Sequence, residues 1–167
     1  MPRRHPHVVN LDEVEPSPGF PKGKFRSTSR GLARAAGAVQ LGCTFYELEP
    51  GHTAFPKHWH GGNEEAVVIL SGEGRLRIGD DEVAVRAGDY LAFPTGPASA
   101  HQLWATGSQP LRYYCFSTMK TPEFVGYPDS KKYGAAVRLD DGKVVRQVFY
   151  EEDARGYFDR EDDARDE

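Results

Sequence analysis

The middle of the chain alternates short apolar runs with turn-forming residues. From Val39 to Phe45 every second residue is apolar and its neighbours are polar or small, which is the two-residue period of a strand. Apolar runs at 75–78 and 83–85 flank Gly79-Asp80-Asp81-Glu82, and this sequence is typical of a hairpin turn. Further short runs that predict strands are 64–70, 90–93, 101–105, 111–118 and 144–150. No segment keeps a helical period over three turns.

The spacing of these runs predicts the fold class. Turn signals recur about every 8–12 residues between positions 50 and 110, which is typical of an antiparallel sandwich or barrel. Residues 101–105 and 111–118 are separated only by 106–110, so we expect them to pair as a hairpin. The chain has 18 Gly and 12 Pro, and this composition disfavours a helical bundle because both residues are poor in helix interiors. We therefore predict an all-β domain.

Charge divides the chain into three parts. Residues 1–34 carry a net charge of +4, residues 35–150 carry −2, and residues 151–167 carry −6. Prolines break up the first part, so we expect an extended arm over 1–34, a β-domain over 35–150 and an acidic, disordered tail over 151–167. The basic arm lacks a nucleic-acid-reading motif, and we expect no nucleic-acid partner.

Features of the sequence also bear on location. No stretch reaches the roughly 18 consecutive apolar residues of a membrane helix, and residues 1–10 lack the apolar core of a signal peptide. The two cysteines, Cys43 and Cys115, are far apart in apolar runs, and we interpret them as buried free thiols. We therefore expect a cytoplasmic protein without membrane contact.

Four side chains form a candidate metal site. His58 and His60 are two residues apart, so on a strand both imidazoles would point to one face. Gly61-Gly62-Asn63 ends that strand, and either Glu64 or Glu65 would return a carboxylate beside them. His101 supplies a third imidazole. An HxH pair alone is more often surface decoration, but neutral imidazoles with a carboxylate are a common environment for a divalent metal.

The residues around these histidines resemble the two motif blocks of the cupin family. In the first block Gly51 precedes His58-Trp59-His60, and Glu65 and Gly72 follow with six residues between them. In the second block Gly88 precedes Pro94-Thr95-Gly96, and His101 follows. The resemblance covers about 51–105, extended by flanking strands to about 38–118. It differs by one extra residue before His58, two before His101, and Ala105 where Asn is usual.

This resemblance implies a double-stranded β-helix, or jelly-roll barrel, with a divalent transition metal at its mouth. The implied ligands are His58, His60, Glu65 and His101. The register of Glu65 to Gly72 selects Glu65 over Glu64. Such a shell leaves open positions and suits Fe(II), Mn or Ni best, although Zn, Co and Cu also tolerate it.

Two functions follow as hypotheses. The first is an enzyme acting on a small polar molecule through isomerase, dioxygenase or decarboxylase chemistry, with a sugar phosphate as one possible substrate. A general base would be needed for isomerisation, and the nearby candidates are Glu64, His52 and Tyr46. A phosphate would require cations at the mouth, for which the candidates are Lys57, Arg75 and Arg112.

The second hypothesis is a binding or sensing module without turnover. Cupin barrels also serve as ligand-binding parts of regulators, although no DNA-binding helix-turn-helix is visible in this sequence. For either function we expect a small-molecule ligand and a homodimer, formed through residues 39–45 or the preceding arm as an exposed sheet edge.

Overall fold

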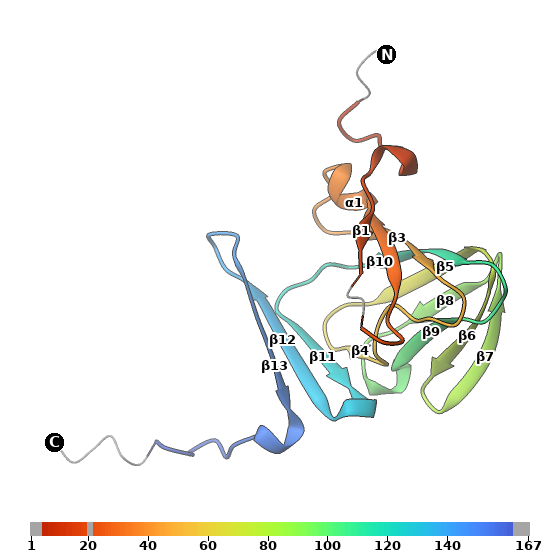
Figure 1. Cartoon of the computed structure of the whole chain (residues 1–167). Coiled ribbons are helices and arrows are strands. Elements are labelled where there is room, and N and C mark those ends of the chain that lie inside the picture. Colours follow the sequence, from red (N-terminus) through yellow and green to blue (C-terminus); the bar gives the residue numbers. More distant parts are fainter. Residues whose placement is uncertain (1–4, 20–21, 162–167) are drawn as a thin grey trace.

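The computed structural model describes residues 5–19 and 22–161, and most of them lie in antiparallel β-strands (Figure 1). The strands are β1 (Ser17–Pro18), β2 (Ser27–Gly31), β3 (Gly42–Leu48), β4 (Trp59–His60), β5 (Glu65–Ser71), β6 (Glu73–Ile78), β7 (Asp81–Arg86), β8 (Tyr90–Phe93), β9 (His101–Ala105), β10 (Leu111–Ser117), β11 (Glu123–Tyr127), β12 (Lys132–Arg138) and β13 (Val144–Tyr150). The helical elements are α1 (Leu32–Ala35) and the 3-10 turns η1 (Leu11–Glu13), η2 (Pro97–Ser99), η3 (Pro128–Ser130) and η4 (Glu151–Asp153). Among these described residues, no helix has the length and apolarity needed to cross a membrane.

The strands form three sheets. A six-stranded sheet has the order β1-β2-β3-β10-β5-β8, and a three-stranded sheet has the order β7-β6-β9. A four-stranded sheet with the order β13-β12-β11-β4 lies beside them (Figure 1). This arrangement confirms the predicted all-β jelly roll.

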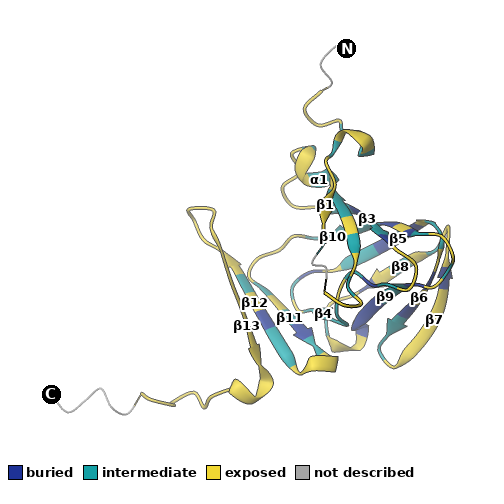
Figure 2. Ribbon diagram, in the orientation of Figure 1, coloured by how far each residue is buried: buried dark blue, intermediate teal, exposed yellow. Residues whose placement is uncertain are grey.

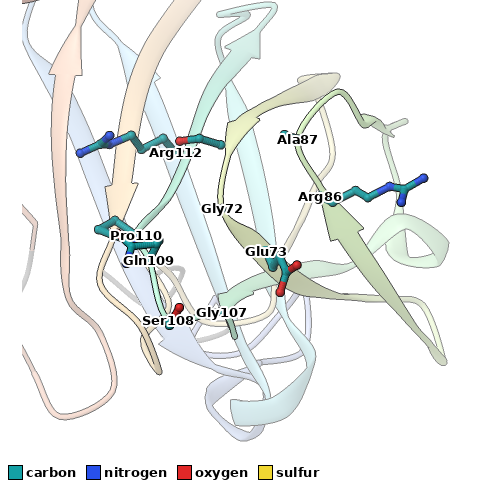
Figure 3. Close-up of a pocket in the computed structure, with 10 residues that line it drawn as sticks. Gly72, Glu73, Arg86, Ala87, Gly107, Ser108, Gln109, Pro110 and Arg112 are labelled. Atoms are coloured by element: carbon teal, nitrogen blue, oxygen red, sulfur yellow. The ribbon is translucent and has the colours of Figure 1, made fainter.

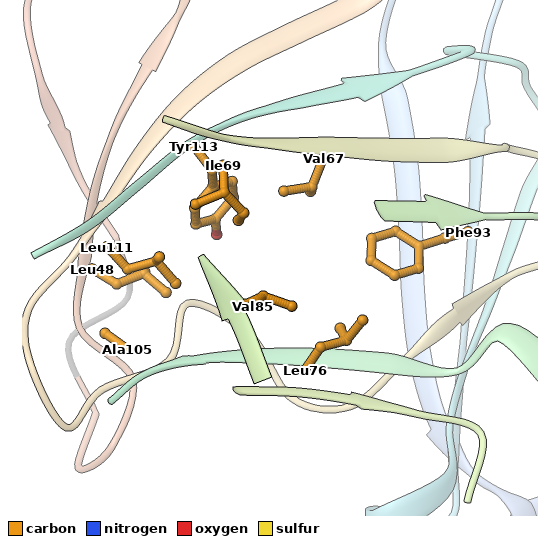
Figure 4. Packing of buried hydrophobic residues seen from close by; sticks show 9 residues of the cluster. All are labelled: Leu48, Val67, Ile69, Leu76, Val85, Phe93, Ala105, Leu111 and Tyr113. Carbon is orange, nitrogen blue, oxygen red and sulfur yellow. The ribbon is translucent and has the colours of Figure 1, made fainter. Parts of the chain in front are cut away.

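The hydrophobic core lies between the six-stranded and three-stranded sheets (Figure 4). Its buried members are Leu48, Val67, Ile69, Leu76, Val85, Phe93, Ala105, Leu111 and Tyr113. Because these side chains come from seven strands of both sheets, they hold the two sheets face to face. Burying each large apolar side chain contributes about 1.5–3 kcal/mol, so this core fixes the barrel on which the site is built.

The predicted hairpin between residues 101–105 and 111–118 is wrong. Strand β9 pairs with β6, whereas β10 lies between β3 and β5 in the other sheet. The intervening loop passes from one sheet to the other, and the backbone N–H groups of Thr106 and Gly107 donate to the carbonyl of Glu73. A short loop predicts proximity of the strand ends, but in a jelly roll consecutive strands can belong to facing sheets.

Two other strand predictions are confirmed with shifted limits. The hairpin of β6 and β7 forms, and its turn is reduced to Gly79 and Asp80, with Gly79 at a positive φ of 52°. The strand expected over 39–45 begins at Gly42 and continues to Leu48. This strand lies between β2 and β10, so it is an interior strand and not the free edge that we expected.

The segments outside the barrel have local structure of their own. Strand β2, which lies in the region assigned to the arm, pairs with β3. Helix α1 follows β2 directly, at the end of that region. At the other end, η4 and residues 154–161 are exposed (Figure 2), and residues 162–167 of the expected tail lie outside the described residues. The domain limits at 34 and 150 therefore stay predictions.

The four-stranded sheet positions the HxH segment. Strand β11 pairs with β4, with Val125 opposite His60 and Gly126 opposite Trp59. Strands β11 and β12 had no counterpart in the sequence analysis, whereas β13 confirms the run at 144–150. The histidines are thus held between the jelly roll and a sheet formed by the C-terminal third of the chain.

Candidate metal centre

His58 and His101 lie side by side at the mouth of the barrel. Their backbones exchange two hydrogen bonds, from His58 N–H to His101 O (3.0 Å) and from His101 N–H to His58 O (2.8 Å). This bridge places the two imidazole centroids 4.6 Å apart. His60 follows on the same side, with its ring centroid 5.0 Å from that of His58. Three imidazoles therefore converge. The two-residue spacing of the HxH segment predicts this for His58 and His60.

Glu65, the first residue of β5, supplies the carboxylate. Its Oε2 lies 3.3 Å from His60 Nε2 and 3.6 Å from His101 Nε2. One potential ligand atom from each of His58, His60 and Glu65 lies within 4.8 Å of the others. Nitrogen and oxygen donors at these separations are compatible with a single transition-metal ion among them.

Backbone carbonyls orient two of the imidazoles. His58 Nδ1 lies 2.9 Å from Pro56 O, and His101 Nδ1 lies 3.0 Å from Ser99 O. Because a carbonyl only accepts, each Nδ1 carries the hydrogen and each Nε2 keeps its lone pair for a ligand. Metal-binding histidines are held by the same kind of second hydrogen bond.

His60 has no hydrogen-bond partner at either ring nitrogen within the described part of the chain, although both nitrogens are buried. Its Nδ1 faces Glu123 Oε1 at 3.7 Å, and its Nε2 faces Glu65. Unsatisfied buried polar atoms are costly, and a metal ion at Nε2 would give this imidazole a partner. The residues present therefore fit a divalent metal.

Glu123 was missed by the sequence analysis. It starts β11, and its Oε1 accepts hydrogen bonds from the N–H groups of Gly62 (3.2 Å) and Phe124 (3.0 Å). The carboxylate thereby fastens the loop after His60 to the C-terminal sheet. No motif spacing connects this residue to the HxH segment, so only the fold could reveal it.

The charges in the site favour the metal-ready forms of Glu65 and His58 but not that of His60. Burial lowers the pKa of His60, but the facing carboxylates of Glu65 and Glu123 outweigh burial and raise that pKa. Burial opposes ionisation of Glu65, but the facing imidazoles of His101 and His60 outweigh it and hold its pKa well below its usual range. Burial, together with His101 and His60, lowers the pKa of His58 to about 4. At neutral pH the site thus presents an ionised carboxylate and a neutral His58, the forms that ligate metals.

A largely apolar cavity of about 220 Å³ adjoins the four residues. Its wall includes Tyr46, Phe93, Tyr113 and Cys115. Phe93 stacks on His101 with centroids 3.7 Å apart, and Tyr46 stacks on Tyr113 at 5.3 Å. An apolar cavity with a few convergent polar groups is typical of a site for a small molecule.

The three predicted acid–base residues have different positions. Tyr46 lines this cavity, whereas Glu64 is exposed and its backbone N–H donates to Thr118 Oγ1. His52 does not line this cavity, and its Nδ1 donates to Pro50 O at 2.9 Å. The structure therefore brings only Tyr46 of the three to the candidate centre.

A larger hollow of about 610 Å³ lies at the other end of β5 (Figure 3). It is lined by the Gly72 and Pro110 turns and by Arg86 and Arg112, and it contains none of the candidate ligands. Glu65 begins β5 and Ser71 ends it, so the strand separates this hollow from the candidate centre. Size alone would have pointed to the end of the barrel opposite the candidate ligands.

Comparison with known proteins identifies the domain. Residues 44–117 match the family model described as "Cupin domain". This region contains all four candidate ligands, so the match places them within a cupin domain. No curated protein matches it significantly.

Solved structures share the fold across most of the chain. One is a protein from Acidithiobacillus ferrooxidans, provisionally named as a sugar phosphate isomerase, which is 24% identical with a TM-score of 0.77; the match covers 90% of this chain and 96% of that one. Another is named a sugar phosphate isomerase of the cupin superfamily, from Silicibacter pomeroyi, with 24% identity, TM-score 0.75 and coverage of 91% and 98%. A predicted oxalate decarboxylase from Thermotoga maritima is 22% identical, with TM-score 0.58 and coverage of 68% and 99%. At these identities the likeness establishes the fold.

Proposed function

We propose that the chain is a metal-dependent enzyme that acts on a small polar molecule, with isomerase chemistry as the best-supported type. The observation that carries the proposal is the convergence of His58, His60, His101 and Glu65, with two Nδ1 atoms tied to carbonyls and their Nε2 atoms left for a ligand. The names of two structural neighbours agree with isomerase chemistry.

A bound divalent ion would act as a Lewis acid that polarises a carbonyl or holds adjacent oxygens of the substrate. The four candidate ligands would hold it. The apolar wall would exclude water from the substrate, and Phe93 would keep the His101 ring in place by stacking on it.

Tyr46 is the proposed hydrogen-bond donor to the substrate. Burial, with smaller contributions from Cys115 and Glu65, raises the pKa of Tyr46 well above its usual range, so the phenol keeps its proton at neutral pH. It can therefore donate a hydrogen bond to a substrate oxygen in the cavity. This position supports a hydrogen-bonding role for Tyr46 more than the base role that we first expected.

A second candidate, binding without turnover, is favoured by the wall of the inner cavity, whose polar members apart from the candidate ligands are Tyr46, Gln102, Tyr113 and Cys115. Burial raises the pKa values of Tyr113 and Cys115 as well as that of Tyr46, so these three wall groups are protonated at neutral pH and are poor bases. Under this alternative the small molecule would bind in the cavity as a ligand and would not lose a proton.

The test combines metal loading with turnover. We expect Mn(II), Fe(II), Ni(II) or Zn(II) to raise the melting temperature of the purified chain. We also expect the loaded protein to interconvert phosphorylated aldoses and ketoses, with solvent deuterium entering the product. Stabilisation by metal without turnover or deuterium exchange across such a panel would favour the binding module, and the absence of metal stabilisation would contradict the metalloenzyme.

A further inference from the structure

A second cavity of about 450 Å³ lies between the candidate metal centre and the C-terminal sheet. His58 and His60 line it from one side, and residues of β11, β12 and β13 line it from the other. The same two imidazoles line the smaller cavity inside the barrel. The candidate ligands therefore separate an inner apolar chamber from an outer one, which we call the vestibule.

The strand register explains why the vestibule is open. Tyr127 pairs with Lys132, Val125 with Gly134, and Glu123 with Ala136. Because these pairs are two residues apart, their side chains share one face of the sheet, and that face lines the vestibule. Gly134 and Ala136 are small, so the middle of this face is left free for a ligand.

The vestibule contains two cations, Lys132 on β12 and Arg146 on β13. Among the described residues, neither makes an ion pair with a carboxylate. The one acid in the lining is Glu123, which faces His60 and is hydrogen-bonded by the Gly62 and Phe124 N–H groups. Two cations without carboxylate partners beside a cavity attract an anion.

Tyr127 connects these cations to the metal centre. Its ring centroid lies 6.2 Å from that of His58, and Lys132 Nζ lies 5.5 Å from the same ring. Arg146 and Tyr127 both line the vestibule. Because both distances are measured to the Tyr127 ring, the Lys132 ammonium and the His58 ring are no further apart than these two distances added together. A small phosphorylated molecule can span that separation.

We infer that Lys132 and Arg146 bind the phosphate group of a small phosphorylated substrate whose other end reaches the metal centre. This inference rests on the proposed function and names its substrate class. A phosphate monoester carries about −1.5 to −2 charges at neutral pH and three acceptor oxygens, which suits two cations better than a carboxylate does. Arg146 offers a planar fork of donors, and Lys132 offers a compact charge.

The cations expected from the sequence do not fill this role. Lys57 donates to the Gly79 carbonyl, Arg75 pairs with Glu82 at 3.4 Å, and Arg112 pairs with Glu47. None of the three lines the inner cavity or the vestibule. Lys132 and Arg146, which do line the vestibule, lie on strands that follow the motif blocks in the sequence.

The test is calorimetric titration of inorganic phosphate into the full-length protein, with metal content measured on the same samples. In the Lys132→Met/Arg146→Met variant we expect the phosphate dissociation constant to rise at least about tenfold, since hydrogen bonds to charged groups are lost. The matched control is Arg75→Met/Lys143→Met, which removes one Arg and one Lys outside both cavities and should leave phosphate binding unchanged. The single variants Lys132→Met and Arg146→Met should each give part of the loss, and they replace the double variant should it fail to fold.

Three outcomes would overturn the inference: no phosphate binding at millimolar concentrations, equal binding by the wild type and the double variant, or acetate binding as tightly as phosphate. Metal content separates this inference from the proposed function. Phosphate binding that depends on Lys132 and Arg146 in a chain that takes up no metal would retain the anion site and reject the metalloenzyme. Normal metal content with unaffected phosphate binding would reject the anion site alone.

Discussion

The backbones of His58 and His101 hydrogen-bond to each other in both directions, at 3.0 and 2.8 Å. This isolated bridge joins two segments 43 positions apart in the sequence and aligns their imidazoles. The preceding residues complete the arrangement, since Pro56 O and Ser99 O each accept the Nδ1 hydrogen two positions later. The histidines are thus fixed by the backbone, and a metal ion would meet a preformed site.

The choice of carboxylate gives the first prediction. Glu65→Gln should weaken metal binding by more than about 100-fold, because it removes an ionised ligand. Changes to residues that only contact a ligand typically weaken metal binding 10–100-fold. Glu64→Gln should leave binding unchanged, since the Glu64 side chain is exposed. Titration with a fluorescent metal chelator measures both variants. The reverse order would show that the wrong glutamate has been assigned.

Glu123 gives the second prediction. Glu123→Gln keeps every candidate ligand but removes the negative charge that faces His60 Nδ1 at 3.7 Å. We expect metal affinity to fall roughly 10–100-fold while the ion count at saturation is unchanged. Glu152→Gln, an exposed change of the same kind in η4, should have no effect. Equal metal affinities of the wild type and Glu123→Gln would show that Glu123 does not contribute to metal binding.

A close approach between two strands gives the third prediction. A Cβ at Gly126 would overlap the indole of Trp59, the residue between the two histidines of the HxH segment. Gly126→Ala should therefore shift Trp59, lower the melting temperature and weaken metal binding. Gly134→Ala in the same sheet is the control, because its Cβ would meet its nearest neighbour at an ordinary 3.6 Å. Similar melting temperatures for the two variants would contradict this packing.

The link between η3 and β6 gives a prediction of pH dependence. Arg77 donates to both carboxylate oxygens of Asp129, at 2.8 and 3.2 Å, and also to Gln102 Oε1 at 3.0 Å. The hydrogen bonds from Arg77 lower the pKa of Asp129 below its usual 3.8. The stabilisation is therefore fully present above that value and is lost as the pH falls through the folded-state pKa.

We expect Asp129→Asn to lower the free energy of unfolding at pH 7 by less than about 1 kcal/mol, because the pair is partly exposed and screened by solvent. Chemical denaturation at several pH values measures this difference. It should shrink below pH 3.8 and vanish once wild-type Asp129 is protonated. A difference that stays constant into strong acid would mean that Asp129 acts through packing and not through its charge.

The two-residue period predicted β-strands, and the resemblance to the cupin motif blocks predicted the jelly roll and the four candidate ligands. In the predicted run 111–118, Leu111 and Tyr113 are buried between the two sheets and Arg112 is exposed, so the two-residue period is visible there. In the run 39–45, by contrast, Val39 and Leu41 are exposed. His58, His60, Glu65 and His101 lie at fixed positions relative to the turns of the two motif blocks, and the structure brings them together.

The C-terminal sheet was only partly predictable. Strand β13 was predicted from its apolar run although all of its residues are exposed. Strands β11 and β12, which contain Gly126 and Gly134, were missed. Lys132, Arg146 and Glu123 therefore had no signal that linked them to the histidines. Their relation to the site arises from pairing of β11 with β4, which is a long-range contact.

The most direct test of the central claim is the metal content of the purified chain after loading with Mn(II) or Ni(II) and dialysis, measured by elemental analysis. The wild type and His52→Ala should each retain about one ion per chain, whereas His58→Ala, His60→Ala and His101→Ala should retain almost none. Equal metal content in His52→Ala and the other three variants, or no metal in the wild type, would contradict the assignment of this site.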